Sequence, residues 1–493
     1  MTSMQHKILK TPWTLSNKVV TNQILKLIMI AVVAFILVDL SLLKFYDLIL
    51  KDPTSIEKKL LLSCLAAIFI VTQIFISSYI NRQNIPFLRI GQFRKIHKIV
   101  VVVNWILTCM VLKVIYEIWF KSYYEINSVI VALFLSYGLG MVMTGHLSYK
   151  FLIWFKSNHG KTMLLYFFSS ALITSAGLFT LVFLYAVLSM YSEIIPTYGG
   201  TAMYMSIFQS NALMLTNIFT TVAFITTWLA TALLLSYRSH IIGRTKYWFF
   251  ISLPLIYFLS QFLSVFTNKL IVFFKDDPIF FGMVLITIFT FSKLIGGILF
   301  GFAFWRMAKT IATELEVPRN LIRLAGYGYV ILLMSTQVVA FSIVPYPPFG
   351  LFTILFYGIA SYMILVGVYF SVIVISQDSK MRNIIKKATE KEPSLISDIS
   401  YAQLENVIEK RTMRLVKNIA VEPSSGLAME QSNFEDLKSY AISVISEIKS
   451  YDPIYTILIE KETEILTRSK IFFVCLNGKL LENLRDHQIS LLS

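Results

Sequence analysis

Long apolar stretches follow one another from residue 25 to residue 376, with short polar segments between them. Each of ten stretches is long enough to cross a hydrocarbon core of about 30 Å as a helix. Their approximate ranges are 25–45, 60–80, 99–120, 126–148, 163–190, 210–236, 247–266, 279–305, 321–344 and 349–376. The pattern predicts an all-α polytopic membrane bundle of about ten transmembrane helices.

Lys and Arg concentrate in every second loop between the predicted spans. The loops after the second, fourth, sixth and eighth spans are basic, whereas loops 191–209 and 345–348 contain no Lys or Arg. Positively charged loops stay on the cytoplasmic side of a membrane. The alternation therefore predicts a multi-pass protein of the cell membrane with both termini in the cytoplasm. The first span is interpreted as a retained signal anchor.

The character of the chain changes after Ser376. Residues 377–493 carry 16 Lys and Arg against 17 Asp and Glu, so the net charge of +16 belongs to the preceding residues. An exit helix over 377–392 continues the last span, and Pro393 ends it. Further helical patterns and a buried-looking strand, "KIFFVCL", come after it. We expect a cytosolic N-terminal segment over 1–24, the membrane domain over 25–376, and a small, mainly helical α+β cytosolic domain over 377–493.

The amino-acid composition limits the classes of function that the protein can have. Hydrophobic residues make up 56% of the chain and charged residues only 15%, which is typical of a membrane protein. The basic excess is explained by loop topology, so we predict no nucleic-acid partner. The three cysteines are not spaced as a CxxC pair, which argues against a disulfide framework or a zinc site.

The segment that follows the last predicted span resembles part of a known group of membrane proteins. "FSVIVISQDSKMRNIIKKA", with the later "YAQLENVIEKRTMRLVK", is similar to the junction found in uncharacterised multispanning membrane proteins of ammonia-oxidising archaea. The resemblance covers residues 370–417 and extends to the spans only in general layout. It implies a run of spans that ends in a serine-rich, basic exit helix. It assigns no activity and no functional residues.

Two charged residues lie deep in predicted spans. Asp39 is 13 residues from Lys26 and Lys293 is 13 residues from Arg306, so each lies about 20 Å from its basic flank. Gln261 and Gln337 fall at a similar depth on two other spans. We therefore predict a mid-membrane polar layer formed by Asp39, Lys293, Gln261 and Gln337.

The predicted layer permits two interpretations. An Asp39–Lys293 ion pair could bind an ion or a ligand, or it could simply fix the order of the helices. Next to Lys293, Gly297 and Gly301 form a face of small residues, which predicts close helix packing. On the third span, Lys113 and Glu117 lie four residues apart and can pair along the helix.

Motifs of catalysis and cofactor binding are missing from the sequence. "NHGKT" resembles the end of a phosphate-binding loop but lacks the required glycine, because position 155 is Phe. Four histidines near predicted span ends have no carboxylate or cysteine spaced to complete a metal or haem site. We predict no catalytic residue, no metal and no cofactor, and hence a protein that is not an enzyme.

The most economical functional hypothesis is a non-enzymatic sensor, signalling or assembly protein. Its bundle would communicate with the cytosolic domain through the exit helix. The alternative is a secondary transporter or channel that uses the polar layer, and a membrane enzyme is a third class. The expected partners are the lipid bilayer and, through residues 394–493, a cytosolic protein or a second copy of the chain.

Overall fold

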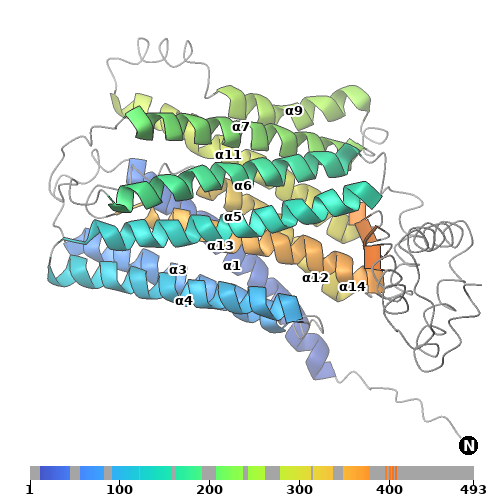
Figure 1. Cartoon of the computed structure of the whole chain (residues 1–493), viewed down its shortest axis with the longest axis horizontal. Coiled ribbons are helices and arrows are strands. Elements are labelled where there is room, and N and C mark those ends of the chain that lie inside the picture. The colour runs from blue at the N-terminus through green and yellow to red at the C-terminus, as the bar shows by residue number, and fades with distance from the viewer. Residues whose placement is uncertain are drawn as a thin grey trace, which may run out of the picture. The chain divides into compact units, whose positions relative to one another are not determined.

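The computed structural model describes most of the membrane domain and a few residues beyond it. The described residues are 12–44, 56–82, 91–121, 123–157, 162–190, 207–236, 243–260, 278–311, 315–336, 348–377, 395–396, 399–400, 402–404 and 406–407. The chain divides into two compact units, Met1–Ala402 and Gln403–Ser493. The helices described below belong to the first unit (Figure 1).

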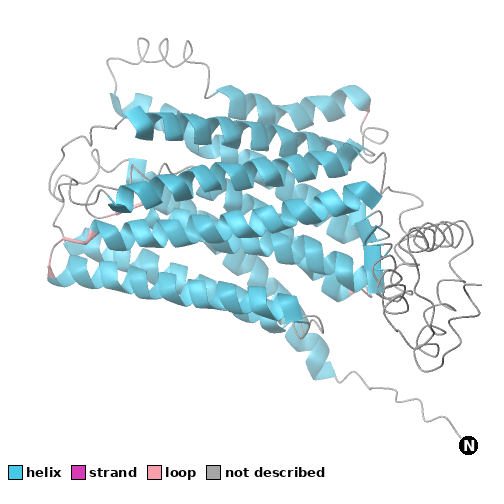
Figure 2. Ribbon diagram, in the orientation of Figure 1, coloured by secondary structure: helices cyan, strands magenta, loops and turns pink. Residues whose placement is uncertain are grey.

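A helix coincides with each of the ten predicted spans in the described part of the chain (Figure 2). Figure 1 shows these helices side by side, with α7 and α9 at one edge of the bundle and α4 at the opposite edge. The helices are α1 (Pro12–Lys44), α3 (Ile56–Arg82), α4 (Gly91–Phe120), α5 (Ile126–Ser157), α6 (Thr162–Met190), α7 (Ile207–Leu235), α9 (Arg244–Ser260), α11 (Pro278–Thr310), α12 (Glu316–Ser335) and α13 (Leu351–Leu365), which continues through the π-helical turn η5 (Val366–Phe370) into α14 (Ser371–Gln377).

Eight helices of the described residues are long and apolar enough to cross a membrane. The other two are α9, which is described over only 17 residues, and α12, which begins with a charged turn. The apolar part of α1 starts at Leu25, as predicted, although the helix itself begins at Pro12. The all-α membrane bundle is therefore confirmed.

Helix α13 is the centre of the bundle. Every side chain from Leu351 to Leu365 is buried, which is typical of a helix that is apolar on all sides. It packs most extensively on α5 and α12, and it also contacts α1, α3 and α4. Phe35 and Phe69 from the first two helices pack against the rings of Phe352 and Phe356.

Glycines bring α11 and α12 close together. A Cβ atom on Gly297 would lie 3.2 Å from the Cα of Val330, and one on Gly301 would lie 2.9 Å from the carbonyl oxygen of Gly326. A larger side chain at either position would push against the backbone of α12. The face of small residues predicted at Gly297 and Gly301 thus lies at a helix contact.

Charged side chains hold the turn between α4 and α5. The Lys113 Nζ lies 3.7 Å from Glu117 Oε1, which confirms the predicted pairing, and 2.7 Å from Glu125 Oε2. The buried carboxylate of Glu117 also accepts the backbone N–H of Glu125 at 2.8 Å. The hydrogen bond from Lys113 lowers the pKa of the exposed Glu125 carboxyl.

The bundle unit extends past the predicted domain boundary at residue 376. Leu395, Ile396, Ile399 and Ala402 are buried within the core of this unit. They belong to the helical pattern that the sequence places in the cytosolic domain, and the domain boundary at residue 376 stays a prediction. Residues 378–392 of the exit helix predicted over 377–392, and residues 408–493 of the predicted α+β domain, lie outside the described residues.

We expect Gly301→Ala to lower the melting temperature of the purified protein. The added Cβ would collide with the backbone at Gly326, and overpacking of this kind costs about 1–3 kcal/mol. Gly138→Ala on α5 is the matched control, because no atom lies within 4 Å of the added Cβ and alanine is the better helix former. A Gly301→Ala protein that melts as high as the control would contradict the close contact.

Candidate functional site

Asp39 binds the N-terminus of α13. Its side chain is fully buried. The Oδ1 atom accepts the N–H of Gly350 at 2.8 Å, and Oδ2 accepts the N–H and the hydroxyl of Thr353 at 3.0 and 2.7 Å. The first N–H groups of a helix have no partner within it, and negative charge is favoured there. Asp39 therefore caps a helix that lies more than 300 residues away in sequence.

The residue that precedes α13 explains why the cap comes from another helix. Gly350 has a φ of 87°, in the left-handed region that favours glycine. Residues that commonly cap helices, such as Ser, Thr, Asp and Asn, supply a side-chain oxygen. Glycine has none, so the carboxylate of Asp39 takes this role.

Lys293 holds the opposite kind of helix end. Its Nζ donates to the carbonyl oxygen of Thr336 at 2.7 Å. Thr336 directly follows Ser335, the last residue of α12. Carbonyl groups at a helix C-terminus lack partners within the helix and attract positive charge. The end of α12 and the start of α13 are thus each bound by a side chain of opposite charge to the helix terminus.

These contacts answer one question that the sequence leaves open. The ion pairs among the described residues do not join Asp39 to Lys293, because each charge has a helix terminus as a partner. Gln261 and Gln337 lie outside the described residues. The contacts of the described residues thus give no Asp39–Lys293 ion pair, a pairing that the sequence leaves open, and the four-residue polar layer stays a prediction.

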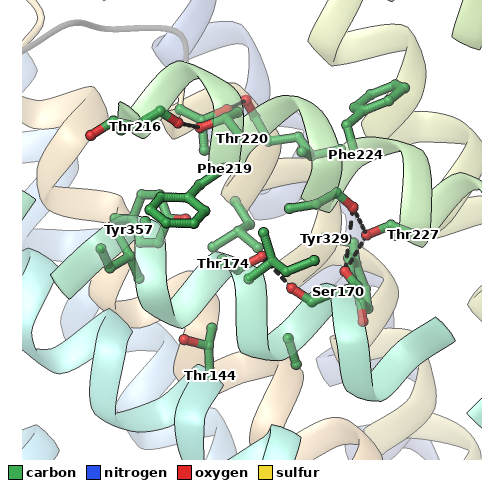
Figure 3. A pocket seen from close by; sticks show the side chains of 18 of the residues that line it. Thr144, Ser170, Thr174, Thr216, Phe219, Thr220, Phe224, Thr227, Tyr329 and Tyr357 are labelled. Carbon is green, nitrogen blue, oxygen red and sulfur yellow. Dashed lines mark hydrogen bonds between the residues drawn. The ribbon is translucent and has the colours of Figure 1, made fainter. Parts of the chain in front are cut away.

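A cavity of about 100 Å³ lies within the bundle. Side chains from α5, α6, α7, α11, α12 and α13 line it (Figure 3). None of the lining residues, all of which the structure describes, carries a charge. The hydroxyl groups in the lining of α5, α6 and α7 belong to Thr144, Ser170, Thr174, Thr216, Thr220 and Thr227.

Hydroxyl groups also join α6 to α7 beside the cavity. The hydroxyls of Ser170 and Thr227 form a short hydrogen bond (Figure 3), and those of Thr180 and Thr216 lie 3.0 Å apart. Membrane helices commonly associate through small residues and hydrogen-bonding side chains of this kind. The cavity wall is therefore part of the contact that holds the two helices together.

Aromatic side chains complete the lining. Tyr137, Tyr329 and Tyr357 come from three different helices, and Phe219 and Phe224 come from α7 (Figure 3). The rings of Tyr137 and Tyr357 meet edge to face with their centroids 5.8 Å apart. Apolar rings with a few polar groups are typical of sites for small molecules.

The sequence feature that corresponds to this cavity is the spacing of Thr and Ser along α6 and α7. On α7, Thr216, Thr220 and Thr227 recur at intervals of four and seven residues, and on α6, Ser170 and Thr174 lie four apart. Such spacing places hydroxyl groups on one face of a helix. Thr and Ser in membrane helices also bond to their own backbone, so the spacing predicts a polar face without identifying a site.

The histidines considered for a metal or haem site have other neighbours. His97 Nδ1 lies 2.7 Å from the hydroxyl of Tyr362, and the ring of His146 packs edge to face on Tyr369. Among the residues that the structure describes, no three His, Cys, Asp or Glu side chains are placed to hold a metal ion. The other two candidate histidines lie outside that part of the chain.

These features define a multi-pass helical membrane protein whose bundle contains an uncharged, hydroxyl-lined cavity. No protein-family model, curated protein or solved structure matches the chain. The cavity and the charged contacts at the helix ends are therefore the features from which a function can be inferred.

We expect Asp39→Ala to reduce the free energy of unfolding by on the order of 3 kcal/mol, because two buried N–H groups and a hydroxyl lose their acceptor. Asp39→Asn keeps one acceptor oxygen and should fall between this variant and the wild type. Ser41→Ala is the control on the same helix, since its hydroxyl donates only along α1, to Leu37 O. Thermal melting in detergent measures all three, and equal melting of Asp39→Ala and Ser41→Ala would refute the capping role.

Proposed function

We propose that the chain is a non-enzymatic membrane transport protein, a transporter or channel, that passes a small uncharged polar solute through the hydroxyl-lined cavity. The observation that carries the proposal is the cavity itself, because the oxygens of its threonine hydroxyls can still accept hydrogen bonds from a polar occupant. Its lining comes from six helices, and binding sites of membrane transporters commonly form where several helices meet.

The position of the charged helix ends supports this proposal. Thr336 lines the cavity and also accepts the hydrogen bond from Lys293. Any movement of the end of α12 therefore changes the cavity wall and the Lys293 contact together. Alternating access in transporters requires such a coupling between the wall of the site and a helix that can shift.

The proposed topology is based on the loops. We place both termini in the cytoplasm of a cell membrane, because the loops rich in Lys and Arg would then all face inward. Residues after the last span would meet cytosolic partners in this arrangement.

A coupling role for the C-terminal part is the second candidate, in keeping with the sensor or assembly hypothesis. The observation that favours it is the burial of Leu395, Ile396, Ile399 and Ala402 in the core of the bundle unit. A segment anchored in this way joins the bundle directly to the residues from Gln403 onward. A change in one could then bias the other.

The transport proposal is tested with the full chain reconstituted into liposomes. We expect urea or glycerol to enter faster than in protein-free liposomes, as measured by stopped-flow light scattering. The double variant Thr174→Val, Thr220→Val keeps the shape of the wall but removes two hydroxyls, and entry should slow about thirtyfold because each of the two hydrogen bonds contributes roughly 1 kcal/mol.

The control for this assay is the double variant Ser169→Ala, Thr221→Val. These hydroxyls bond to the carbonyl four residues earlier at 2.8 Å, as Thr174 and Thr220 do, but they are exposed and do not line the cavity. Its rates should match the wild type. Entry of both solutes no faster than in empty liposomes, or an unaffected cavity variant, would refute transport through this site.

The coupling role predicts a different result. Deletion of residues 403–493 should leave the melting temperature of the bundle near that of the full chain but change the solute entry rate at least about fivefold, the lower end of common coupling effects. If the truncated protein is folded and transports at the wild-type rate, the C-terminal part does not regulate the bundle.

A further inference from the structure

The threonine hydroxyl groups of the cavity are oriented by their own helices. Thr174 donates to Ser170 O, Thr220 donates to Thr216 O, and Thr144 donates to Gly140 O, at 2.8, 2.8 and 2.9 Å. The other lining threonines follow the same rule, with acceptors on α7 for Thr216 and Thr227 and on α12 for Thr336.

This orientation decides which hydrogen bonds the wall can offer. A hydroxyl has one proton and two lone pairs. When the proton is committed to a backbone carbonyl, the oxygen can only accept a further bond. The threonine part of the wall is therefore rich in acceptors, and the lining groups suited to donate are the phenol groups of Tyr137, Tyr329 and Tyr357 and the amide of Asn217.

The uncharged lining and the volume of the cavity further limit which molecules can occupy it. No lining residue carries a charge that could neutralise an ion, and a charged group placed in the hydrocarbon region costs about 2.5–3.5 kcal/mol on insertion scales. A space of about 100 Å³ holds several water molecules or a solute of roughly three to five non-hydrogen atoms.

We propose that the cavity selects small neutral molecules that carry several N–H donors and a single acceptor, such as a small amide. The donors bind the threonine oxygens, and the acceptor binds a tyrosine hydroxyl. The proposal rests on the proposed function and specifies its substrate class.

Three planar solutes of nearly equal size test the donor requirement. Urea, acetamide and acetone each have four non-hydrogen atoms and one carbonyl, with four, two and no N–H groups. Guanidinium has the shape of urea but carries a charge. The readout is the melting temperature of the full chain in lipid nanodiscs at millimolar solute, compared with that of Thr174→Val, Thr220→Val, because a ligand of the native state raises the melting temperature.

Relative to the variant, the melting temperature of the wild type should rise most with urea and less with acetamide. It should not rise with acetone or guanidinium. The variant Ser169→Ala, Thr221→Val should behave as the wild type. A shift with acetone as large as that with urea would overturn donor selectivity, and one with guanidinium would overturn neutrality, while the cavity would remain a binding site in both cases.

Suppose that no solute shifts the melting temperature, but glycerol enters through the wild-type protein and the cavity variant slows this entry. This result would overturn the substrate class alone. No shift together with no protein-dependent entry would overturn the proposed function as well. The two failures are thereby distinguishable.

Discussion

A buried helix N-terminus places the strongest constraint on this bundle. Within hydrocarbon, each backbone N–H needs a partner inside the protein, and α13 is surrounded by other helices along its whole length. Gly350 turns the chain into α13 with a φ that favours glycine, so it offers no capping side chain. The carboxylate of Asp39 on α1 accepts the N–H groups of Gly350 and Thr353 instead. The first helix of the bundle is thereby tied to the central one, and the remaining packing is arranged around that pair.

Small residues allow the other helices to approach α13 closely. A Cβ on Gly358 would lie 3.2 Å from Ser136 O on α5, and one on Gly328 of α12 would lie 3.0 Å from Ala360 O. At η5 the approach is closer still, because a Cβ on Gly367 would lie 2.5 Å from Leu321 O. Lipid tails are as apolar as the side chains, so close contact and hydrogen bonding hold these helices together in place of the hydrophobic effect.

Apolar patterning was sufficient to predict that a helix lies in each of these ten stretches, because the length of a membrane helix is set by the bilayer. It was not sufficient for the partners of Asp39 and Lys293. Counting residues gives the depth of a side chain but neither its direction around the helix nor the position of other helix ends. The sequence leaves open whether the two charges pair, whereas Asp39 binds the start of a helix far along the chain and Lys293 binds the end of the next helix, α12. The cavity was missed because Thr and Ser bond equally well to their own backbone.

Separation of the charges from the cavity gives the site its chemical character. Asp39 and Lys293 are engaged by helix ends, so the cavity wall keeps only hydroxyl, phenol, amide and apolar groups. The wall is also linked to the close packing of α11, because a side chain at Gly296 would displace the ring of Phe224, which lines the cavity. A shift of α11 would thus move Lys293 and Phe224 together. The same helix that secures the end of α12 can therefore change the shape of an uncharged site.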